Sequence, residues 1–513
     1  MPAPSFVTIR RDSYYDSVLL MRLSQALKRR AGVADAEVVM GTPNNRELLV
    51  AAGFGGDELA AAGPNDLVIA VKGEGITAAV VEEELHALLE AGRTTTGEET
   101  RPATLAAALR DRPELNLVLI SVPGEHAARE ARHALAAGKH VMIFSDNVSL
   151  EDEVALKRDA VTRGLLMMGP DCGTAIINGK PLAFANAVRR GPIGVVGAAG
   201  TGIQEVTSCV HRLGGGVSQA IGTGGRDLSD AVGGVMTLFG IEALAADQET
   251  KVIVVISKPP SPSVAEKVVA ALAASGKPAV VHFVGAKPQS GHETRGIVFA
   301  DSLAGAARDA CRLAGGARKR TPAVSEALVT DLAGRLGRRA KLRGLFCGGT
   351  TGHEALALLA RAGIRVRSNL QKQASLWIDG TVPVSGHVLL DLGDDVFTRG
   401  RPHPMIEPVL RNERLELEMA DATVGVLLFD LVLGYGAHPD PAGVLRDGLE
   451  RARVLASRRS RKLVAIASVT GTQDDPQDSA EQTRKLSAAG VVVMPDNAQA
   501  AQLAAAVLAR IAP

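Results

Sequence analysis

The segment from Gly191 to Glu205, GPIGVVGAAGTGIQE, constrains the fold of this chain more than any other. Its apolar residues Ile193, Val195 and Val196 predict a buried strand, and a helix is expected from about Ile203. The glycines between them allow a sharp turn and a close approach to a ligand. Because the start of a helix offers N–H groups and a positive dipole end, it suits an anion. The segment predicts either a phosphate or carboxylate cradle or a tight turn that binds nothing.

The candidate phosphate contacts in this segment are Ala199, Gly200, Thr201 and Gly202, with a hydroxyl supplied by Thr201. Two common phosphate-binding fingerprints are absent from it. No Lys-Ser/Thr pair marks a P-loop, and the glycines do not follow the G-x-G-x-x-G spacing. The segment therefore indicates anion binding but does not by itself identify a family.

Composition excludes several classes of protein. The 57 basic and 56 acidic residues give a net charge of +1, so no strong field attracts nucleic acid or anionic lipid. The four cysteines, Cys172, Cys209, Cys311 and Cys347, have neither metal-ligand spacing nor a disulfide framework. No signal peptide or membrane-spanning segment is recognisable. We expect a soluble cytoplasmic protein without a bound metal.

Strands alternate with helices along the whole chain, which predicts an α/β protein built from several doubly wound parallel sheets. The predicted domains are a small α/β module over residues 1–92, a truncated Rossmann-type domain over 104–190, and flavodoxin-type domains over 191–315 and 323–513. Breaker-rich segments at 93–101 and 315–322 are expected to be linkers. The N-terminal module is more typical of regulation or assembly than of catalysis.

Two later stretches repeat the layout of strand, glycine-rich turn and helix. The first contains the candidate substrate contacts Gly348, Gly349 and Thr350. The second runs from Gly434 to Pro441, and a helix is expected to start after Pro439 or Pro441. Within it, Gly436 and Ala437 are candidate phosphate contacts, and His438 is a candidate acid–base residue.

The densest polar cluster comprises Asp391, Asp394, Asp395, Arg399, Arg401 and His403. Its arginines have two interpretations: they fork onto a substrate carboxylate, or they form surface ion pairs. Cys172 and Cys347 lie in glycine-rich turns without the His/Asp pattern of a nucleophile, which favours a packing role.

Taken together, these motifs resemble the succinyl-CoA synthetase superfamily, and most closely its FdrA-type members. Gly169-Pro-Asp171-Cys172 stands where the family has Gly-Pro-Asn-Cys, and Ala199-Gly-Thr with Glu205 stands where it has Ser-Gly-Thr and a later Glu. Gly348-Gly-Thr, Gly393-Asp-Asp and Gly434-Tyr-Gly fall on the family's substrate-site turns. The resemblance sets residues 104–315 against the α subunit and 341–513 against the last domain of the β subunit. Through it, Asp171, Cys172, Gly173, Asp394 and Gly434 become candidate substrate contacts, and Glu205 a candidate catalytic residue.

The chain also departs from that family. The ligase carries phosphate on a histidine in a Gly-His-Ala-Gly turn, where this chain has Gly296-Ile-Val-Phe-Ala300. His292 lies on the other side of Gly296. The CoA-pyrophosphate loop and the ATP-grasp domain have no counterpart. The resemblance therefore implies a phosphate cleft between the helix starts near Gly200 and Gly436, with CoA and ATP not expected as cofactors.

The resemblance implies an enzyme subunit that uses carbamoyl phosphate, an acyl phosphate that needs neither ATP nor CoA. The expected reaction is that of an oxamate carbamoyltransferase of purine (allantoin) catabolism, with acyl phosphate and carboxylate substrates, partner enzyme subunits and a possible homo-oligomer. Two alternatives remain: a succinate–CoA ligase-like enzyme and a non-catalytic metabolite-binding scaffold.

Overall fold

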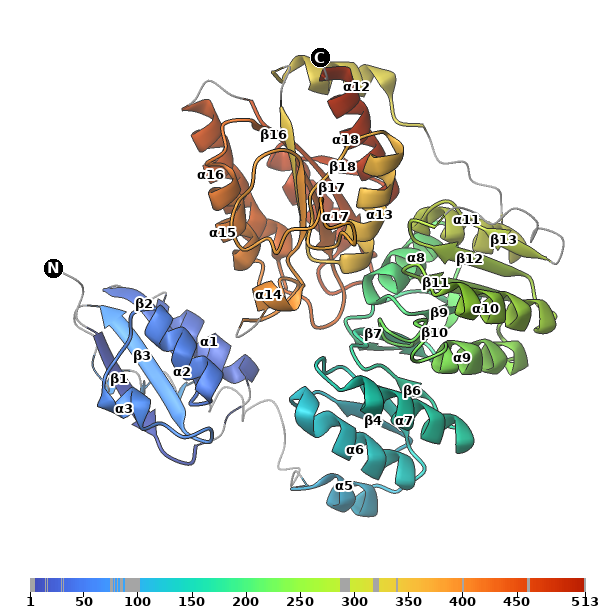
Figure 1. The fold of residues 1–513 in the computed structure, drawn as a ribbon, viewed down its shortest axis with the longest axis horizontal. Coiled ribbons are helices and arrows are strands. Elements are labelled where there is room, and N and C mark those ends of the chain that lie inside the picture. Colours follow the sequence, from blue (N-terminus) through green and yellow to red (C-terminus); the bar gives the residue numbers. More distant parts are fainter. Residues whose placement is uncertain are drawn as a thin grey trace. The chain divides into compact units, whose positions relative to one another are not determined.

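The computed structural model describes residues 5–286, 296–316, 323–337, 340–398, 401–458 and 462–511, apart from 14, 16, 29, 31, 74–76, 78, 81, 84–85 and 88–101. The chain divides into two compact units, Met1–Ala103 and Thr104–Pro513 (Figure 1). The segment 93–101, most of the predicted linker at 315–322, Arg399 and His292 lie outside the described residues.

The N-terminal unit contains a three-stranded sheet in the order β1-β3-β2. Both outer strands pair with β3 in antiparallel fashion, so β1 and β2 are parallel to each other and joined by helix α1. This is the split β-α-β arrangement. The elements are β1 (Ser5–Arg10), α1 (Ser17–Lys28), β2 (Val33–Met40), α2 (Pro43–Ala51), α3 (Asp57–Ala60) and β3 (Leu67–Gly73).

The second unit begins with a small parallel sheet in the order β4-β5-β6. Its apolar core is rich in alanine and packs helices α6 and α7 against the strands. The elements are α5 (Leu105–Asp111), β4 (Leu117–Ile120), α6 (Gly124–Ala136), β5 (His140–Ile143), α7 (Leu150–Thr162) and β6 (Met167–Met168).

A seven-stranded sheet follows in the order β13-β12-β11-β9-β10-β7-β8. Strands β9 to β13 are parallel, whereas the hairpin β7–β8 adds two antiparallel strands at one edge. The hairpin belongs to this sheet, although its residues precede the predicted domain boundary at 190. The elements are β7 (Thr174–Ile177), β8 (Lys180–Ala183), β9 (Arg190–Gly197), α8 (Gly200–Arg212), β10 (Val217–Gly222), α9 (Val235–Ala246), β11 (Val252–Ser257), α10 (Pro262–Ala274), β12 (Ala279–Phe283), β13 (Ile297–Phe299) and α11 (Leu303–Leu313).

The last part of the chain forms a five-stranded sheet in the order β15-β14-β16-β17-β18, in which all pairs are parallel. The elements are α12 (Glu326–Gly334), β14 (Lys341–Phe346), α13 (Gly349–Arg361), β15 (Val388–Asp391), α14 (Asp395–Thr398), α15 (Val409–Glu418), β16 (Val424–Val432), α16 (Pro441–Ser457), β17 (Val464–Thr470), α17 (Ser479–Ala488), β18 (Val492–Met494) and α18 (Asn497–Ile511).

Each large sheet is covered on both faces. Apolar residues of α8 and α11 form one core of the seven-stranded sheet, and those of α9 and α10 form the other. The five-stranded sheet lies between α12, α13 and α18 on one face and α15, α16 and α17 on the other (Figure 1). All residues of β11, β16 and β17 are buried, as expected for central parallel strands. The predicted α/β class with doubly wound parallel sheets is confirmed.

The two large domains meet through four helices, α8 and α11 from one and α13 and α18 from the other. Glu205 on α8 accepts hydrogen bonds from the Thr470 hydroxyl (2.6 Å) and from the backbone N–H of Asn497 (3.2 Å). Glu354 on α13 accepts from the backbone N–H of Leu303 (2.7 Å) and from the Asn497 side chain (2.8 Å). Each glutamate thus bonds the first residue of a helix in the opposite domain.

A buried ion network joins the small three-stranded domain to the seven-stranded one. Lys157 on α7 donates to Glu153 (2.7 Å) on the same helix and to Asp227 (2.8 Å) after β10. It also donates to the carbonyl of Thr223 (2.8 Å). Lys157 and Asp227 are both 0% exposed, so each charge depends on its partners.

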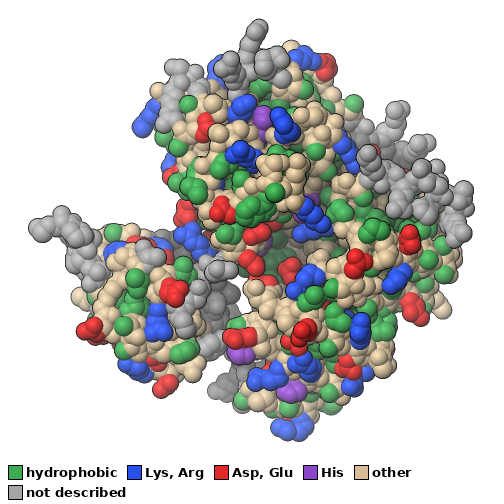
Figure 2. All heavy atoms as spheres, in the orientation of Figure 1, with side chains coloured by type: hydrophobic (Ala, Val, Ile, Leu, Met, Phe, Trp, Pro, Cys, Tyr) green, Lys and Arg blue, Asp and Glu red, His purple; other side chains and the backbone are tan. Residues whose placement is uncertain are grey.

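Charge on the molecular surface is mixed. Basic and acidic side chains are interspersed over the face shown in Figure 2, in keeping with the net charge of +1. Among the described residues, no helix has the length and apolar character needed to cross a bilayer.

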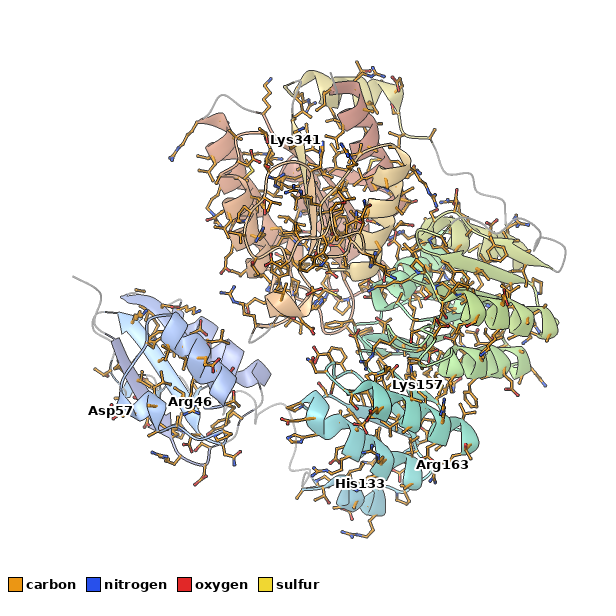
Figure 3. All side chains as sticks on the ribbon, in the orientation of Figure 1. Arg46, Asp57, His133, Lys157, Arg163 and Lys341 are labelled. Atoms are coloured by element: carbon orange, nitrogen blue, oxygen red, sulfur yellow. The ribbon has the colours of Figure 1, made fainter. Side chains whose placement is uncertain are left out.

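We predict that Lys157→Ala lowers the free energy of unfolding by about 3–5 kcal/mol, because it leaves Asp227 buried without a cation and Glu153 with Arg226 alone. The matched control is Arg163→Ala at the C-cap of the same helix (Figure 3), which breaks an exposed pair with Asp159 and should cost at most about 0.5 kcal/mol. Urea unfolding of both variants measures the difference. Equal shifts would contradict a structural role for the buried network.

A second prediction concerns pH. Burial raises the pKa of Glu354 to about 8, from an ordinary value of 4.5. The pKa of Glu354 is higher in the folded protein than in the unfolded chain. Its contribution to the free energy of unfolding is therefore fully present below pH 4.5 and is lost as the pH rises towards 8. The urea midpoint of the wild type should therefore fall between pH 5 and pH 9 by more than that of Glu354→Gln, which cannot ionise. Parallel curves for the two proteins would contradict the assignment.

Candidate functional site

Helix α8 starts earlier than expected. It begins at Gly200, three residues before the predicted start at Ile203, so Gly200, Thr201 and Gly202 form its first turn. The N-cap residue, Ala199, makes no side-chain cap hydrogen bond. The first N–H groups of a helix have no partner within it, so this turn presents donors at the carboxyl end of β9. The local geometry fits the anion-binding interpretation of the glycine-rich segment.

Helix α13 starts in the same way after β14. Its N-cap, Gly348, makes no side-chain cap hydrogen bond. The backbone N–H groups of Cys347 and Gly348 both donate to Asp430 on β16 (2.9 Å each), and the Thr351 hydroxyl donates to the same carboxylate (2.8 Å). Arg411 lies 3.2 Å from Asp430 and balances its charge. Asp430 therefore holds the turn before α13 in place.

The starts of α8 and α13 are in direct contact. A Cβ atom on Gly202 would lie 2.9 Å from Cγ2 of Thr350, and one on Gly348 would lie 2.9 Å from Cγ2 of Thr201. Such distances are too short for real Cβ atoms, so the glycines are needed for the close approach of the two backbones. The structure thus joins two groups of predicted contacts, Gly200–Gly202 and Gly348–Thr350, at one place.

The second helix start predicted for the phosphate cleft has a different arrangement. The turn at Gly434 and Gly436 precedes α16, which starts only at Pro441. Its N-cap is Asp440, whose carboxylate accepts from the N–H of Gly443 (3.2 Å). Because the Asp440 carboxylate already takes up a backbone N–H of the first turn, this helix start offers fewer free backbone donors than that of α8. The phosphate position between Gly200 and Gly436 stays a prediction, whereas the starts of α8 and α13 are in contact.

The turn at Gly434 contacts the seven-stranded domain in another way. Gln204 on α8 donates to the carbonyls of Leu433 (3.0 Å) and Phe184 (2.5 Å), and the N–H of Tyr435 donates to Ala185 (3.0 Å). A Cβ atom on Gly434 would lie 2.6 Å from the carbonyl oxygen of Phe184. These contacts give Gly434 a packing role between the domains.

Charged side chains from both large domains surround the start of α13. A Cβ atom on Gly349 would lie 2.7 Å from Oδ2 of Asp391 and 3.8 Å from Nζ of Lys258. Lys258 directly follows β11, and Asp391 ends β15. Burial raises the pKa of Asp391 to about 7, although the Lys258 ammonium opposes this shift. The site thus combines a cation with a carboxyl group that titrates near neutrality.

Two further groups interact electrostatically with Lys258. Burial raises the pKa of Asp171 to about 6, with Lys258 acting against it and the carboxylates of Asp146 and Asp395 adding to it. Burial and the positive charges of Lys258 and Lys372 lower the pKa of His353 to about 4. His353 is therefore neutral at physiological pH. We call Lys258, Asp171, Asp391 and His353, together with the starts of α8 and α13, the cleft cluster.

Sequence reasoning missed Lys258 and His353. Lys258 had a usable signal, since it directly follows a wholly buried strand whose neighbour in the sheet, β9, leads into the glycine-rich turn. His353 lies one turn into α13, where no sequence pattern distinguishes it from other helical residues.

Several predicted site residues have structural partners. Glu205 is buried in the domain interface described above, where burial raises its pKa and its carboxylate accepts the structural hydrogen bonds from Thr470 and Asn497. Cys172 is buried, its thiol pKa is raised to about 12, and it packs as expected against Gly222 and Thr174. Gly173 accepts from the N–H of Phe184 (2.9 Å).

The polar cluster after β15 is only partly brought to the site. Asp391 belongs to it, whereas Asp394 accepts from the N–H of Val396 (3.1 Å) in the first turn of α14. Arg401 forms an exposed ion pair with Glu413 (2.7 Å), so the surface interpretation of this arginine is correct. His438 lies in a separate cavity with residues of α16 and α17, and Ala437 is in the turn before it. Among the described residues, no three His, Cys, Asp or Glu side chains are grouped to hold a metal ion.

Comparison with known proteins identifies the family. The chain is 43% identical over 491 residues to the "Uncharacterized protein YahF" of Escherichia coli (strain K12), covering 95% of both chains. The chain belongs to the YahF family. It is an FdrA-like protein of the succinyl-CoA synthetase superfamily, because a CoA-ligase model matches residues 345–507 and a CoA binding domain model matches residues 188–285. A model described as AllF, heavy metal-associated domain, matches residues 3–104.

More distant similarities concern parts of the chain. The mitochondrial succinate–CoA ligase [ADP-forming] subunit alpha-2 of Trichomonas vaginalis is 28% identical over 152 residues, which is 29% of this chain and 48% of the relative. The chain thus matches about half the length of that subunit. The dinucleotide-forming acetyl-coenzyme A synthetase 1 of Ca. Korarchaeum cryptofilum, solved with phosphate and ADP, shares 15% identity and a TM-score of 0.33, over 77% of this chain and 82% of that one.

We predict opposite effects for two glycine substitutions in the first turn of α8. Gly202→Ala forces a methyl group against Thr350 and should lower the free energy of unfolding by about 1–3 kcal/mol. In Gly200→Ala the methyl lies 3.6 Å from the Thr174 hydroxyl, an ordinary contact, so stability should be unchanged or rise by up to about 1 kcal/mol. Urea unfolding of both variants tests the direct contact between α8 and α13. Equal effects would contradict it.

Proposed function

We propose that this chain is an enzyme subunit that binds an acyl phosphate in the cleft cluster and transfers its acyl group. The observation that supports this most is the meeting of two helix starts without side-chain caps, with Lys258 beside the second of them. The N-terminus of α8 is the better phosphate position, since α13 already faces Asp430 and Asp391. The phosphate would lie between the first turn of α8 and the Lys258 ammonium.

The strength of such a site is moderate. A helix N-terminus contributes about 0.3–1 kcal/mol to anion binding when exposed and up to about 2 when partly buried. Hydrogen bonds to charged groups add about 1.5–3 kcal/mol each. Together these terms correspond to dissociation constants from roughly millimolar to micromolar, without a P-loop or a metal.

Asp391 suits the role of proton acceptor. In acyl transfer from an acyl phosphate, the acceptor attacks the carbonyl carbon, the bond to the phosphate oxygen breaks, and phosphate leaves with the bonding electrons. The acceptor must lose a proton in the same reaction. A carboxyl group with a pKa of about 7 is well matched to take it at neutral pH. Lys258 and the α8 N–H groups would stabilise the departing phosphate.

Two acceptors are possible, and the comparisons favour a thiol. The CoA-ligase and CoA binding domain models, together with the relatives named succinate–CoA ligase, point to a CoA-acid ligase-type reaction. The carbamoyltransferase proposal, in which an amide nitrogen such as that of oxamate attacks carbamoyl phosphate, rests on the FdrA-type resemblance. In its favour, residues 297–299 form strand β13 and contain no histidine where the resemblance places the phosphate carrier. That route would need neither CoA nor ATP, and partner subunits would complete it.

The N-terminal unit is proposed to act in assembly or regulation. Its matched family model is named for heavy-metal association, but residues 3–104 contain no cysteine and a single histidine, His86. Soft metals prefer thiolate ligands, so these residues do not fit such a site.

Calorimetric titration with inorganic phosphate, acetyl phosphate and carbamoyl phosphate tests the proposed site. We expect wild-type binding that Lys258→Gln weakens about tenfold or more and that Gly200→Val also weakens, because valine disturbs the first turn of α8. Lys267→Gln, an exposed lysine on the following helix α10, is the matched control and should bind normally. Normal binding by Lys258→Gln and Gly200→Val would show that the phosphate lies elsewhere.

The acceptor is distinguished in the same experiment by adding CoA or oxamate with the acyl phosphate and measuring phosphate release. Release that depends on CoA supports the ligase-type reaction, and release from carbamoyl phosphate that depends on oxamate supports the carbamoyltransferase. Asp391→Asn should abolish either release while leaving phosphate binding intact.

A further inference from the structure

A cavity lies on the five-stranded domain, outside the cleft cluster. It has a volume of about 480 Å³ and lies between the first turns of α16 and the end of α17. This size is in the range of small-molecule sites. Its walls are formed by His438, Asp440, Gly443, Val444, Arg446, Asp447, Arg484, Lys485 and Ala488.

Three cationic side chains line this cavity, those of Arg446, Arg484 and Lys485. Arg446 lies 3.4 Å from Asp447, and both side chains are more than half exposed, so this pair contributes little and a ligand with two negative charges can replace it. Arg484 makes two hydrogen bonds to Glu481 (2.6 and 2.9 Å), with 69% of the arginine side chain exposed. A ligand must compete with Glu481 for this arginine.

Asp440 has other partners. Its Oδ1 accepts from the N–H of Gly443 (3.2 Å) and from the Gln482 side chain (3.2 Å), and it lies 2.8 Å from Nζ of Lys485. This carboxylate is used to cap α16 and to hold α17. It therefore opposes an anion in the cavity less than its formal charge suggests.

His438 supplies a further polar group. Its Nδ1 accepts from the N–H of Asp440 (3.0 Å), so the neutral imidazole carries its proton on Nε2. Its position is fixed through the main chain, since its N–H donates to Met405 (2.8 Å) and its carbonyl accepts from Gln477 (3.3 Å). An imidazole beside arginine side chains is a combination of groups that can bind an oxyanion.

We propose that this cavity binds a small organic dianion, a dicarboxylate or a phosphate monoester, through Arg446, Arg484 and His438. The site is separate from the proposed phosphate position, and it does not depend on the acyl-transfer chemistry. Loop 433–440 forms its wall and also carries Leu433, whose carbonyl accepts from Gln204 on α8. Ligand binding in the cavity is thereby connected through one loop to the first turns of α8.

The test is calorimetric titration of the intact chain with malonate and with glycerol 3-phosphate at low salt. We expect saturable binding of at least one of them with a dissociation constant of roughly millimolar or below. Arg446→Gln combined with Arg484→Gln should weaken it about tenfold or more. The matched control is Arg451→Gln, which removes an exposed cation from the same helix α16, paired with Glu416 outside the cavity. It should bind as the wild type does.

Lys258→Gln separates this site from the cleft cluster. If it leaves malonate or glycerol 3-phosphate binding unchanged while the double arginine variant loses it, the proposal is supported. Binding of either anion supports the proposal, and the one bound more tightly indicates whether the natural ligand carries carboxylates or a phosphate. Absence of binding to both anions, or equal binding by the double variant and the wild type, would overturn it. Loss of binding in Lys258→Gln would place the anion in the cleft instead.

Discussion

The contact between the first turns of α8 and α13 is the constraint on which the rest of this structure depends. Gly202 and Gly348 allow the two backbones to approach, and no other residue fits at either position without moving a neighbour. Glu205 and Glu354, further along the two helices, then bond helix starts in the opposite domain. Close approach and buried hydrogen bonds together fix how the two large sheets present their carboxyl ends to each other.

That arrangement has an electrostatic consequence. Lys258 from one domain and Asp391 from the other come close to Gly349, although neither is near the other in sequence. Burial raises the pKa of Asp391 and lowers that of His353, so a carboxyl group that titrates near neutrality and a neutral imidazole lie with Lys258 in the cleft cluster. The surroundings of each titratable side chain thus decide its protonation state, as in many active sites.

Contacts between the domains also explain why some side chains that could take part in chemistry do not belong to the cleft cluster. Glu205 follows the glycine-rich turn as the superfamily motif requires, yet its carboxylate bonds Thr470 and Asn497. The glycine turn at Gly434 packs against Phe184. Helix α16 starts only seven residues later, at Pro441, and has Asp440 as its N-cap. A motif specifies a backbone path, whereas partners contributed by another domain decide what the side chain does.

The sequence by itself determined the α/β class and the superfamily, because these follow from local periodicity, turn residues and motif order, but it did not indicate the hairpin β7–β8. It also indicated that Gly200–Gly202 and Gly348–Thr350 lie in glycine-rich turns that lead into helices. Only the tertiary structure decided that these two starts meet each other, that Lys258 and Asp391 lie beside them, and that His438 faces a different cavity. The physical reason is that such contacts form between domains and depend on packing across some 150 residues of chain, which local patterns do not encode.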